Sequence, residues 1–445
     1  MLVIQAFNYV DGLALGLVLQ DIKLDLHLSD GQLGFLTGIA FALFYSVMGV
    51  PIARWADRGN RVTIIALTAS LWSVLVALCG VARNFTQMLL IRIGVAVGEA
   101  GCIPPAHSLI ADYFDRTERA RAVGIYMLAG SLSPLIGYFV AGWLNQLYGW
   151  RVMFVLLGLP GLIPATIAWL TLREPRRQPR TGLEASTGAH PTTAKPSTAT
   201  QLEAPSAEPS LRAVGVTLWA NGTFRYLLLS FAVMTFFGAG ISQWQPAFFI
   251  RSYGLKTGEL GSWLTVIYGL GAMLGVYWGG QLASRCAANQ EQRQLKFMAA
   301  AYSVFAVLST FIYLAPNQYI AFLFMGIAAI GSNSIIAPLF AIIQTLVPPR
   351  MRAMSIAIIY LFSNLLGLGL GPLTVGLLSD ASRSILGEES LRYTLLSLCP
   401  GYLCGAWLLW RASRTVTRDL ETLEIPSSSD NRENEYVVKG NHGAA

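Results

Sequence analysis

The chain has 445 residues, of which 54% are hydrophobic and only 12% are charged. Soluble globular domains carry roughly 25% charged residues, and the mean hydropathy here is +0.53, so the composition excludes an ordinary soluble enzyme and predicts a membrane protein. The net charge of +7 does not indicate a nucleic-acid partner, because the basic residues lie in short segments between apolar runs. The five cysteines show neither metal-binding nor disulfide spacing, so we expect no metal and no cofactor.

Twelve segments of the chain are long and apolar enough to cross a membrane, which takes about 20 residues. The first contains Asn8 and Asp11 and has no basic stretch before it, so it predicts a span rather than a secretion signal. A long charge-free stretch near the ninth and tenth spans is divided by a turn at Pro316 and Asn317. The predicted spans are residues 2–20, 32–53, 62–82, 87–110, 122–145, 152–172, 226–250, 259–283, 297–314, 318–345, 353–378 and 393–411.

Arginine and lysine are concentrated in alternate loops between the spans. The loops after the second, fourth, sixth, eighth and tenth spans are rich in them, and the intervening loops carry few. Because basic loops stay in the cytoplasm, these loops and both termini are predicted to be cytoplasmic, with Asp30 and Glu388 on the outside. We therefore expect a multi-pass protein of the cell's inner (plasma) membrane.

A long polar segment divides the spans into two sets of six. Residues 173–221 form this predicted cytoplasmic linker, and its centre, residues 181–210, is rich in Ala, Pro, Ser and Thr, which indicates flexibility. The linker separates an N-terminal half, residues 1–172, from a C-terminal half, residues 222–414, and residues 415–445 form a polar cytoplasmic tail. The predicted fold is an all-α membrane protein of twelve transmembrane helices in two pseudo-symmetric halves.

The loop after the second span, Ala53–Arg61, resembles the loop motif G-x-L-x-D-R-x-G-R of the major facilitator superfamily. Its acid, Asp57, can engage basic residues or a facing helix N-terminus in one access state and release them in the other. A related segment after the eighth span has Ser284 in place of the acid, which predicts a weaker latch there. The alternative is a loop that only anchors the topology. The candidate gating residues are Asp57, Arg58, Arg61 and Arg121.

Three ionisable residues lie at membrane depth: Asp11 in the first span, and Arg92 and Glu99 in the fourth. Charges at this depth are expensive, so they usually face a bundle interior or a water-filled cavity. Arg92 and Glu99 are seven residues apart and share a helix face. A buried carboxylate can take a proton near neutral pH, and arginine keeps its charge and suits an anionic ligand. The candidate proton-coupling residues are therefore Asp11 and Glu99, with Arg92 binding substrate; the alternative is a purely structural network.

Polar and aromatic residues in otherwise apolar spans are candidates for lining a cavity near the membrane midplane. The candidate substrate-binding residues besides Arg92 are Tyr45, Tyr126, Trp244, Tyr268, Asn333 and Asn364. The fifth span also contains Gly137 and Gly142, which permit either close helix packing or a hinge.

The sequence around these residues resembles the Spinster branch of the major facilitator superfamily. The similar segments are Asn8–Asp11, Ala56–Arg61, Arg92–Ala100, Ser108–Phe114, Gly367–Pro372 and Gly376–Asp380. The resemblance implies the major facilitator fold, a protonation pair of Asp11 and Glu99, and a cavity arginine at Arg92; eukaryotic members export sphingosine-1-phosphate or lysophospholipids. The family often has arginine directly after the first-span acid, and Gly12 stands there in this chain, which leaves Asp11 free to pair with Arg92.

We therefore expect a secondary active transporter that moves a small organic solute, amphipathic or anionic, by rocker-switch alternating access coupled to protons. The expected partners are the solute, protons and membrane lipids, and the expected state is a monomer. No nucleotide-binding loop of the Walker kind is present, so ATP drive is not expected. The alternatives are a membrane-embedded lipid-modifying enzyme, for which His107 and Asp112 are the nearest candidates, and a sensor without transport.

Overall fold

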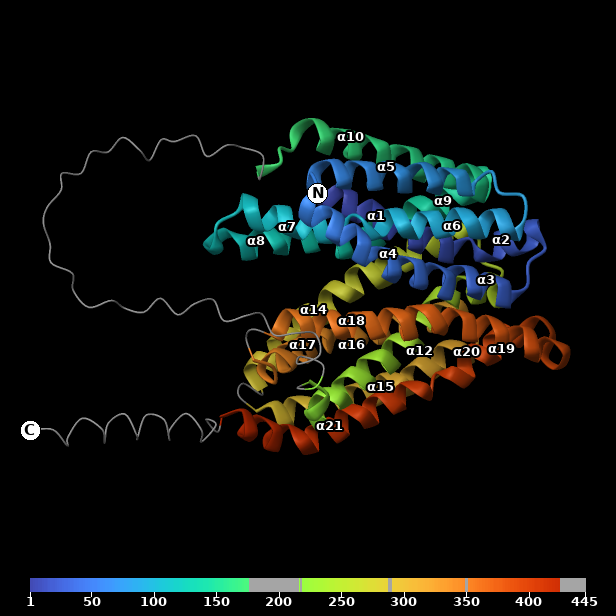
Figure 1. Ribbon diagram of the computed structural model, residues 1–445. Helices are drawn as coiled ribbons and strands as arrows, with labels where there is room; N and C mark the ends of the chain where they lie inside the picture. The colour runs from blue at the N-terminus through green and yellow to red at the C-terminus, as the bar shows by residue number, and fades with distance from the viewer. Residues whose placement is uncertain (176–215, 217, 287–289, 349–350, 425–445) are drawn as a thin grey trace, which may run out of the picture.

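The computed structural model describes residues 1–175, 216, 218–286, 290–348 and 351–424, and within these ranges it consists of helices and connecting turns without strands. Figure 1 shows the helices in two groups, α1 to α10 above and α12 to α21 below. Most of the predicted linker and most of the predicted tail lie outside the described residues.

The N-terminal half contains ten α-helices and one 3-10 turn. Their bounds are α1 Leu2–Leu17, α2 Leu19–Leu26, α3 Asp30–Thr37, α4 Ile39–Arg58, α5 Arg61–Cys79, α6 Phe85–Ala100, α7 Ile103–Tyr113, α8 Arg116–Met127, α9 Ala129–Gly158, η1 Leu159–Gly161 and α10 Leu162–Thr171. The C-terminal half has α12 Gly222–Tyr253, α13 Thr257–Leu264, η3 Thr265–Leu270, α14 Gly271–Cys286, α15 Glu291–Leu314, α16 Gln318–Ser334, α17 Ile336–Thr345, α18 Arg352–Phe362, η5 Ser363–Gly369, α19 Leu370–Leu386, η6 Gly387–Glu389, α20 Ser390–Leu398 and α21 Gly401–Glu424.

By length and composition, the described helices fit the predicted spans. Nine helical stretches of the described residues are long and apolar enough to cross a membrane, or ten if the bent pair α1 and α2 is one span. Two of these, of 55 and 68 residues, are far longer than one crossing and each contains two predicted spans. Gly149 and Gly387, both with positive φ, interrupt these two stretches between the two predicted spans that each contains.

Asparagine side chains begin several of the helices. The side-chain oxygen of Asn60 accepts the backbone N–H of Thr63, and an asparagine does the same at the start of α6, α12 and α16. Such caps satisfy one of the backbone donors that a helix start leaves without an intrahelical partner. Each of these asparagines therefore fixes the residue at which a polar loop ends and a membrane helix begins.

The last helix extends beyond its predicted end. The sequence assigned residues 415–445 to a polar tail, but α21 continues to Glu424. Asp419, at 6% exposure, accepts hydrogen bonds from the backbone N–H and the hydroxyl of Thr223, at 2.7 and 2.8 Å. Asp419 thus attaches this part of the helix to the start of α12 through hydrogen bonds, which hydropathy alone does not reveal.

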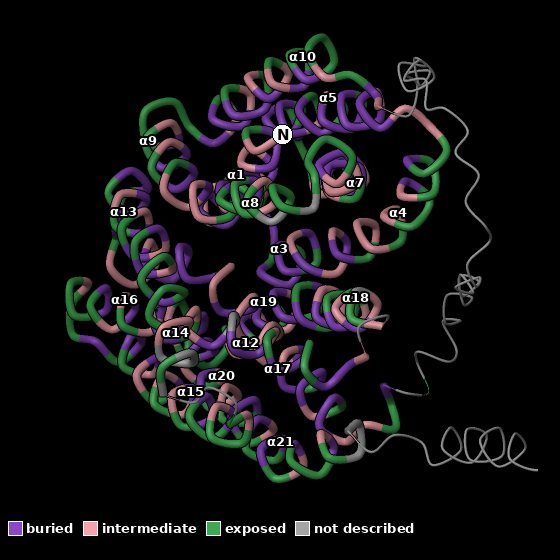
Figure 2. Tube along the Cα trace, turned by 90° about the vertical axis from the view of Figure 1, so that its left-hand side faces the viewer, coloured by how far each residue is buried: buried purple, intermediate pink, exposed green. Residues whose placement is uncertain are grey.

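The two halves meet at the end of the molecule that carries Asp30, called here the Asp30 end. At the right of Figure 1, α3 of the first half packs against α19 of the second. Helix α9 packs against α13, and Figure 2 shows these two helices next to each other. Glycines allow these approaches: a Cβ at Gly34 would lie 2.5 Å from the carbonyl oxygen of Pro372, and one at Gly142 would lie 2.5 Å from that of Thr257. The opposite end, called the Arg61 end, carries the loop between α4 and α5.

Apolar side chains cover much of the outer surface. Leu170 is 70% exposed and Trp278 is 62% exposed, and Figure 2 shows exposed residues on the outward turns of the helices, with buried ones facing inward. Soluble monomers rarely expose apolar surface of this extent, and a lipid environment accounts for it. The structure thus confirms an all-α membrane fold.

Candidate functional site

The three charges expected at membrane depth gather inside the N-terminal half. Asp11 of α1 and Arg92 of α6 form an ion pair of 2.5 Å between Oδ2 and Nη1, with exposures of 2% each. Glu99 lies about two turns from Arg92 on the same face of α6. It is 5% exposed and accepts the indole N–H of Trp72 at 3.0 Å. The departure at Gly12 predicted an Asp11–Arg92 pair, and the structure contains it.

The hydrogen-bonding capacity of this cluster is only partly used. Asp11 Oδ1, Arg92 Nε and Asn8 Nδ2 are buried and have no hydrogen-bond partner among the described protein atoms. The guanidinium also lies 5.5 Å from the centre of the Phe41 ring on α4, a cation–π contact. The cluster therefore keeps buried acceptor and donor atoms to which a further polar group could bind.

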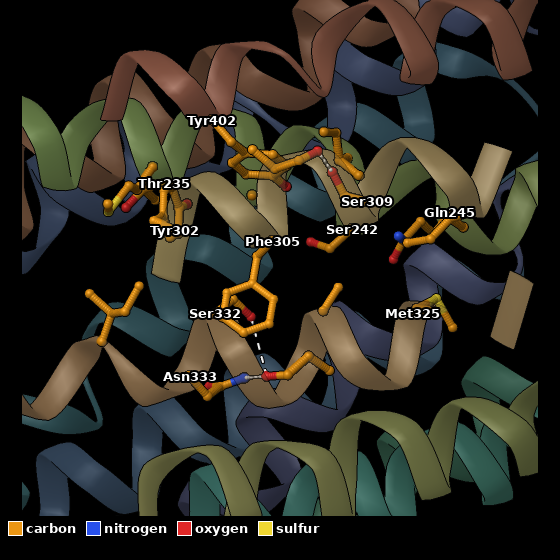
Figure 3. A pocket seen from close by; sticks show the side chains of 18 of the residues that line it. Thr235, Ser242, Gln245, Tyr302, Phe305, Ser309, Met325, Ser332, Asn333 and Tyr402 are labelled. Atoms are coloured by element: carbon orange, nitrogen blue, oxygen red, sulfur yellow. Dashed lines mark hydrogen bonds between the residues drawn. The ribbon is translucent and has the colours of Figure 1, made fainter. Parts of the chain in front are cut away.

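The C-terminal half contains a cavity of about 300 Å³ between α12, α15, α16 and η3. Its described lining is aromatic and aliphatic with a few uncharged polar groups and without a charged side chain. Figure 3 shows Phe305, Ser242 and Gln245 directed into this space. The hydroxyl of Tyr268 donates a hydrogen bond to Oε1 of Gln245. Nε2 of Gln245 in turn donates to the hydroxyl of Tyr313 at 3.2 Å.

Tyr268 and Asn333 are the two predicted substrate-binding residues that line this cavity. Gln245 lines it too, whereas its neighbour Trp244, a predicted substrate-binding residue, does not. Trp244 is fully buried and its indole donates to the carbonyl of Pro372 at 2.9 Å, so it packs between helices. Consecutive helical residues point about 100° apart, and an apolar span gives no periodicity that would tell one from the other.

The remaining predicted binding residues lie apart from the cavity lining. Tyr45 is half-buried and stacks on Phe41, 5.8 Å between ring centres, which places it near the Arg92 side of α4. Tyr126 is buried and donates to Gln5 Oε1 at 2.7 Å. Asn364 lies in the π-helical segment η5.

The predicted gating residues lie at the Arg61 end with different surroundings. Arg61 is fully buried and joins three parts of the N-terminal half, with Asp112 at 2.6 Å, Glu174 at 2.5 Å and Ser108 at 2.7 Å. Asp57, Arg58 and Arg121 are exposed. Glu174 falls in the predicted linker, but it is only 8% exposed, so the linker's first residues are part of the packed half.

The residues considered for a lipid-modifying enzyme are occupied in other ways. The ring of His107 packs edge-on against Tyr126, 5.2 Å between centres, and Asp112 pairs with Arg61. The two side chains therefore contact different partners.

Two helical halves that meet at one end and bury charges within a lipid-facing bundle define a membrane transporter. The family model described as Major Facilitator Superfamily matches residues 1–372. The chain belongs to the major facilitator superfamily, and it is similar to Spinster proteins within that superfamily.

Three similar proteins support this assignment. A solved bacterial homologue of the human lysosomal transporter Spinster, in an inward-facing and unoccupied conformation, is 29% identical with a TM-score of 0.78, covering 94% of this chain and 96% of that one. An MFS-type efflux pump of Mycolicibacterium smegmatis is 30% identical over 414 residues, 93% of this chain and 91% of the relative. A probable L-galactonate transporter of Escherichia coli is 26% identical over 384 residues, 85% of this chain and 81% of the relative.

Proposed function

We propose that the protein is a proton-coupled secondary transporter of a small organic solute, anionic or amphipathic, that works by rocker-switch alternating access. The observation that carries the proposal is the buried cluster of Asp11, Arg92 and Glu99, with the 2.5 Å ion pair at its centre. Keeping three ionisable groups at membrane depth costs several kcal/mol, which favours a role in transport beyond packing.

The chemistry of the solute is inferred from the two halves. Arg92 supplies a permanent positive charge in the first half, and the cavity of the second half is aromatic and uncharged. An anionic group at Arg92 with an apolar part toward the cavity would match both surfaces. A relative named for L-galactonate, an organic anion, agrees with the anionic part. The proposal concerns the chemistry of the solute and leaves the direction of transport open.

Protonation provides the proposed coupling step. A proton on Asp11 or Glu99 removes one negative charge from around Arg92, which frees the guanidinium to bind an anion; loss of the proton restores the pair and releases the anion. The halves would then rock about the bound solute. Contacts at the Asp30 end and the likeness to an inward-facing structure support an inward-facing state here.

We place the protein in the inner membrane as a monomer with both termini in the cytoplasm, so that the Arg61 end is cytoplasmic. Its lipid-facing surface is apolar. Asp57, Arg58 and Arg121 are exposed at that end, where Asp57 would act as a latch when the halves close there.

The test is flux in proteoliposomes with a panel of organic anions and amphiphiles, with and without a pH gradient. Glu99→Gln keeps the shape of the side chain and removes its titration, so gradient-driven transport should fall to the background rate while solute exchange persists. Glu118→Gln, at an exposed acid in α8 of the same half, is the matched control and should transport like the parent.

Full gradient-driven flux in the Glu99→Gln protein would assign the three charges to a structural network. A parent protein that moves no member of the panel under any gradient would instead favour a sensor without transport.

A further inference from the structure

The Asp30 end carries a second charge cluster, and this one joins the two halves. Asp30, at the start of α3 and 1% exposed, accepts four hydrogen bonds. Lys23 of the same half donates one at 2.7 Å. The other three come from the C-terminal half: two from Arg251, at 2.7 and 2.8 Å, and one from Ser379 at 2.8 Å.

Arg251 gives its hydrogen bonds to the opposite half. Besides the two bonds to Asp30, its Nε donates to Gln20 Oε1 at 2.6 Å. The side chain is 7% exposed, so separation of the halves would strip a nearly buried guanidinium of all three of these acceptors. Charge-assisted hydrogen bonds of this forked kind are the strong ones.

Asp380 makes the reciprocal contact, from the second half to the first. Its two carboxylate oxygens accept the backbone N–H groups of Asp30 and Gly31, at 3.0 and 2.6 Å. These are the first amides of α3, so the carboxylate also lies at the positive end of that helix. Gly31 makes room for it, because a Cβ there would lie 3.1 Å from Asp380 Oδ2.

We propose that Asp30, Arg251 and Asp380 form a gate that holds the Asp30 end closed. The contacts of this gate must break and form again in every transport cycle. The proposal rests on the proposed transport function. When this end opens, the Asp30 carboxylate loses three of its four hydrogen bonds and keeps only the one from Lys23. Arg251 and Asp380, both in the C-terminal half, move away from Asp30 together. The predicted gating residues all lie at the Arg61 end, so this gate is additional to them; Asp30 was predicted only as a residue on the outside.

The gate is tested by the distance between spin labels at Leu24 in α2 and Ile385 in α19, which are 62% and 85% exposed on opposite halves. The labels are placed in a cysteine-free protein in lipid nanodiscs, and the distances are measured by double electron–electron resonance. Asp30→Asn, Arg251→Gln and Asp380→Asn should each raise the ratio of long to short distances about tenfold, because each removes charge-assisted bonds across the interface.

Two variants serve as contrasts. Glu388→Gln removes an ion pair at the same end, with Arg383 at 2.8 Å, but within one half, so the distances should not change. Asp57→Asn removes an acid at the opposite end, not at the Asp30 end. The fraction of molecules with the short distance between the labels should therefore stay the same or rise.

Unchanged distances in Arg251→Gln and Asp380→Asn proteins that elute as a single folded species would overturn the gate, even if Asp30→Asn fails to fold. The measurement needs neither solute nor proton gradient, so its outcome is separate from that of the flux assay. If the distances shift but the protein transports nothing, the gate is supported and the transport function is rejected. If the protein transports but the distances do not shift, the transport function is supported and the gate is rejected.

Discussion

Arg92 differs from its two acidic neighbours because it cannot lose its charge in the protein. Arg92→Lys keeps the charge but replaces the planar, forked donor with a point charge, so the affinity for an anionic solute should fall about tenfold, the equivalent of one weakened charge-assisted hydrogen bond. Competition binding in detergent measures it. Arg83→Lys, at an exposed position of the same half outside every predicted site, is the control, and equal affinities of the parent and Arg92→Lys would remove Arg92 from the substrate site.

Asp11 is tested through stability. Asp11→Asn leaves the guanidinium of Arg92 buried without the counter-ion that lies 2.5 Å away, and removing one partner of a buried pair costs about 3–5 kcal/mol. The midpoint of thermal unfolding in detergent should fall by several degrees. An unchanged midpoint would show that Glu99 replaces Asp11 as the counter-ion.

At this scale the sequence predicts charges better than it predicts contacts. Asp11, Arg92 and Glu99 could be singled out because any charge stands out in an apolar span. The indole that holds Glu99, Trp72, could not, since one tryptophan among apolar residues has no distinguishing signal. The contact of Asp380 with the backbone of Asp30 could not be predicted either, because only the fold brings positions 350 residues apart together.

Among the elements, the crossing of α9 with α13 can be tested directly. Gly142→Ala would place a Cβ 2.5 Å from the carbonyl oxygen of Thr257, so the helices cannot close as they do here. We expect the spin-label pair at the Asp30 end to shift toward long distances. Gly124→Ala, where a Cβ meets nothing within 4 Å, should keep the closed distance and gain up to about 1 kcal/mol of helix propensity. If both variants keep the short distance between the spin labels, the crossing of α9 with α13 tolerates the added methyl group.

The sequence predicted the membrane spans but not their breaks. Residues 2–20 were expected as one span, whereas α1 and α2 meet at an angle of 57° and α2 continues to Leu26. Hydropathy reports length and apolar content, and neither changes at a bend. The π-helical turns η3 and η5 escape prediction for the same reason, although such turns frequently occur at functional sites, and η3 places Tyr268 in the cavity wall.

For the whole molecule, two similar halves and the family could be predicted, because one linker divides the spans into two sets of six and the loop motif has a related copy after the eighth span. The conformational state could not. A transporter has at least two packings of one sequence, and a sequence pattern applies equally to both. Which end is closed follows only from contacts such as those of Arg251 with Gln20 and Asp30.

The orientation of the molecule in the membrane can be tested by labelling exposed positions at its two ends. The charge pattern puts Asp30 and Glu388 outside and the linker at Ser206 inside, but Asp30 is buried and Ser206 lies outside the described residues. Single cysteines are therefore placed at Asp25 and Glu388 for the outside and at Arg58 for the inside, because all three side chains are exposed. A membrane-impermeant maleimide on intact cells should label the first two within minutes and Arg58→Cys only after the cells are opened. Labelling of Arg58→Cys in intact cells would reverse the topology, and the Asp30 gate would then face the cytoplasm.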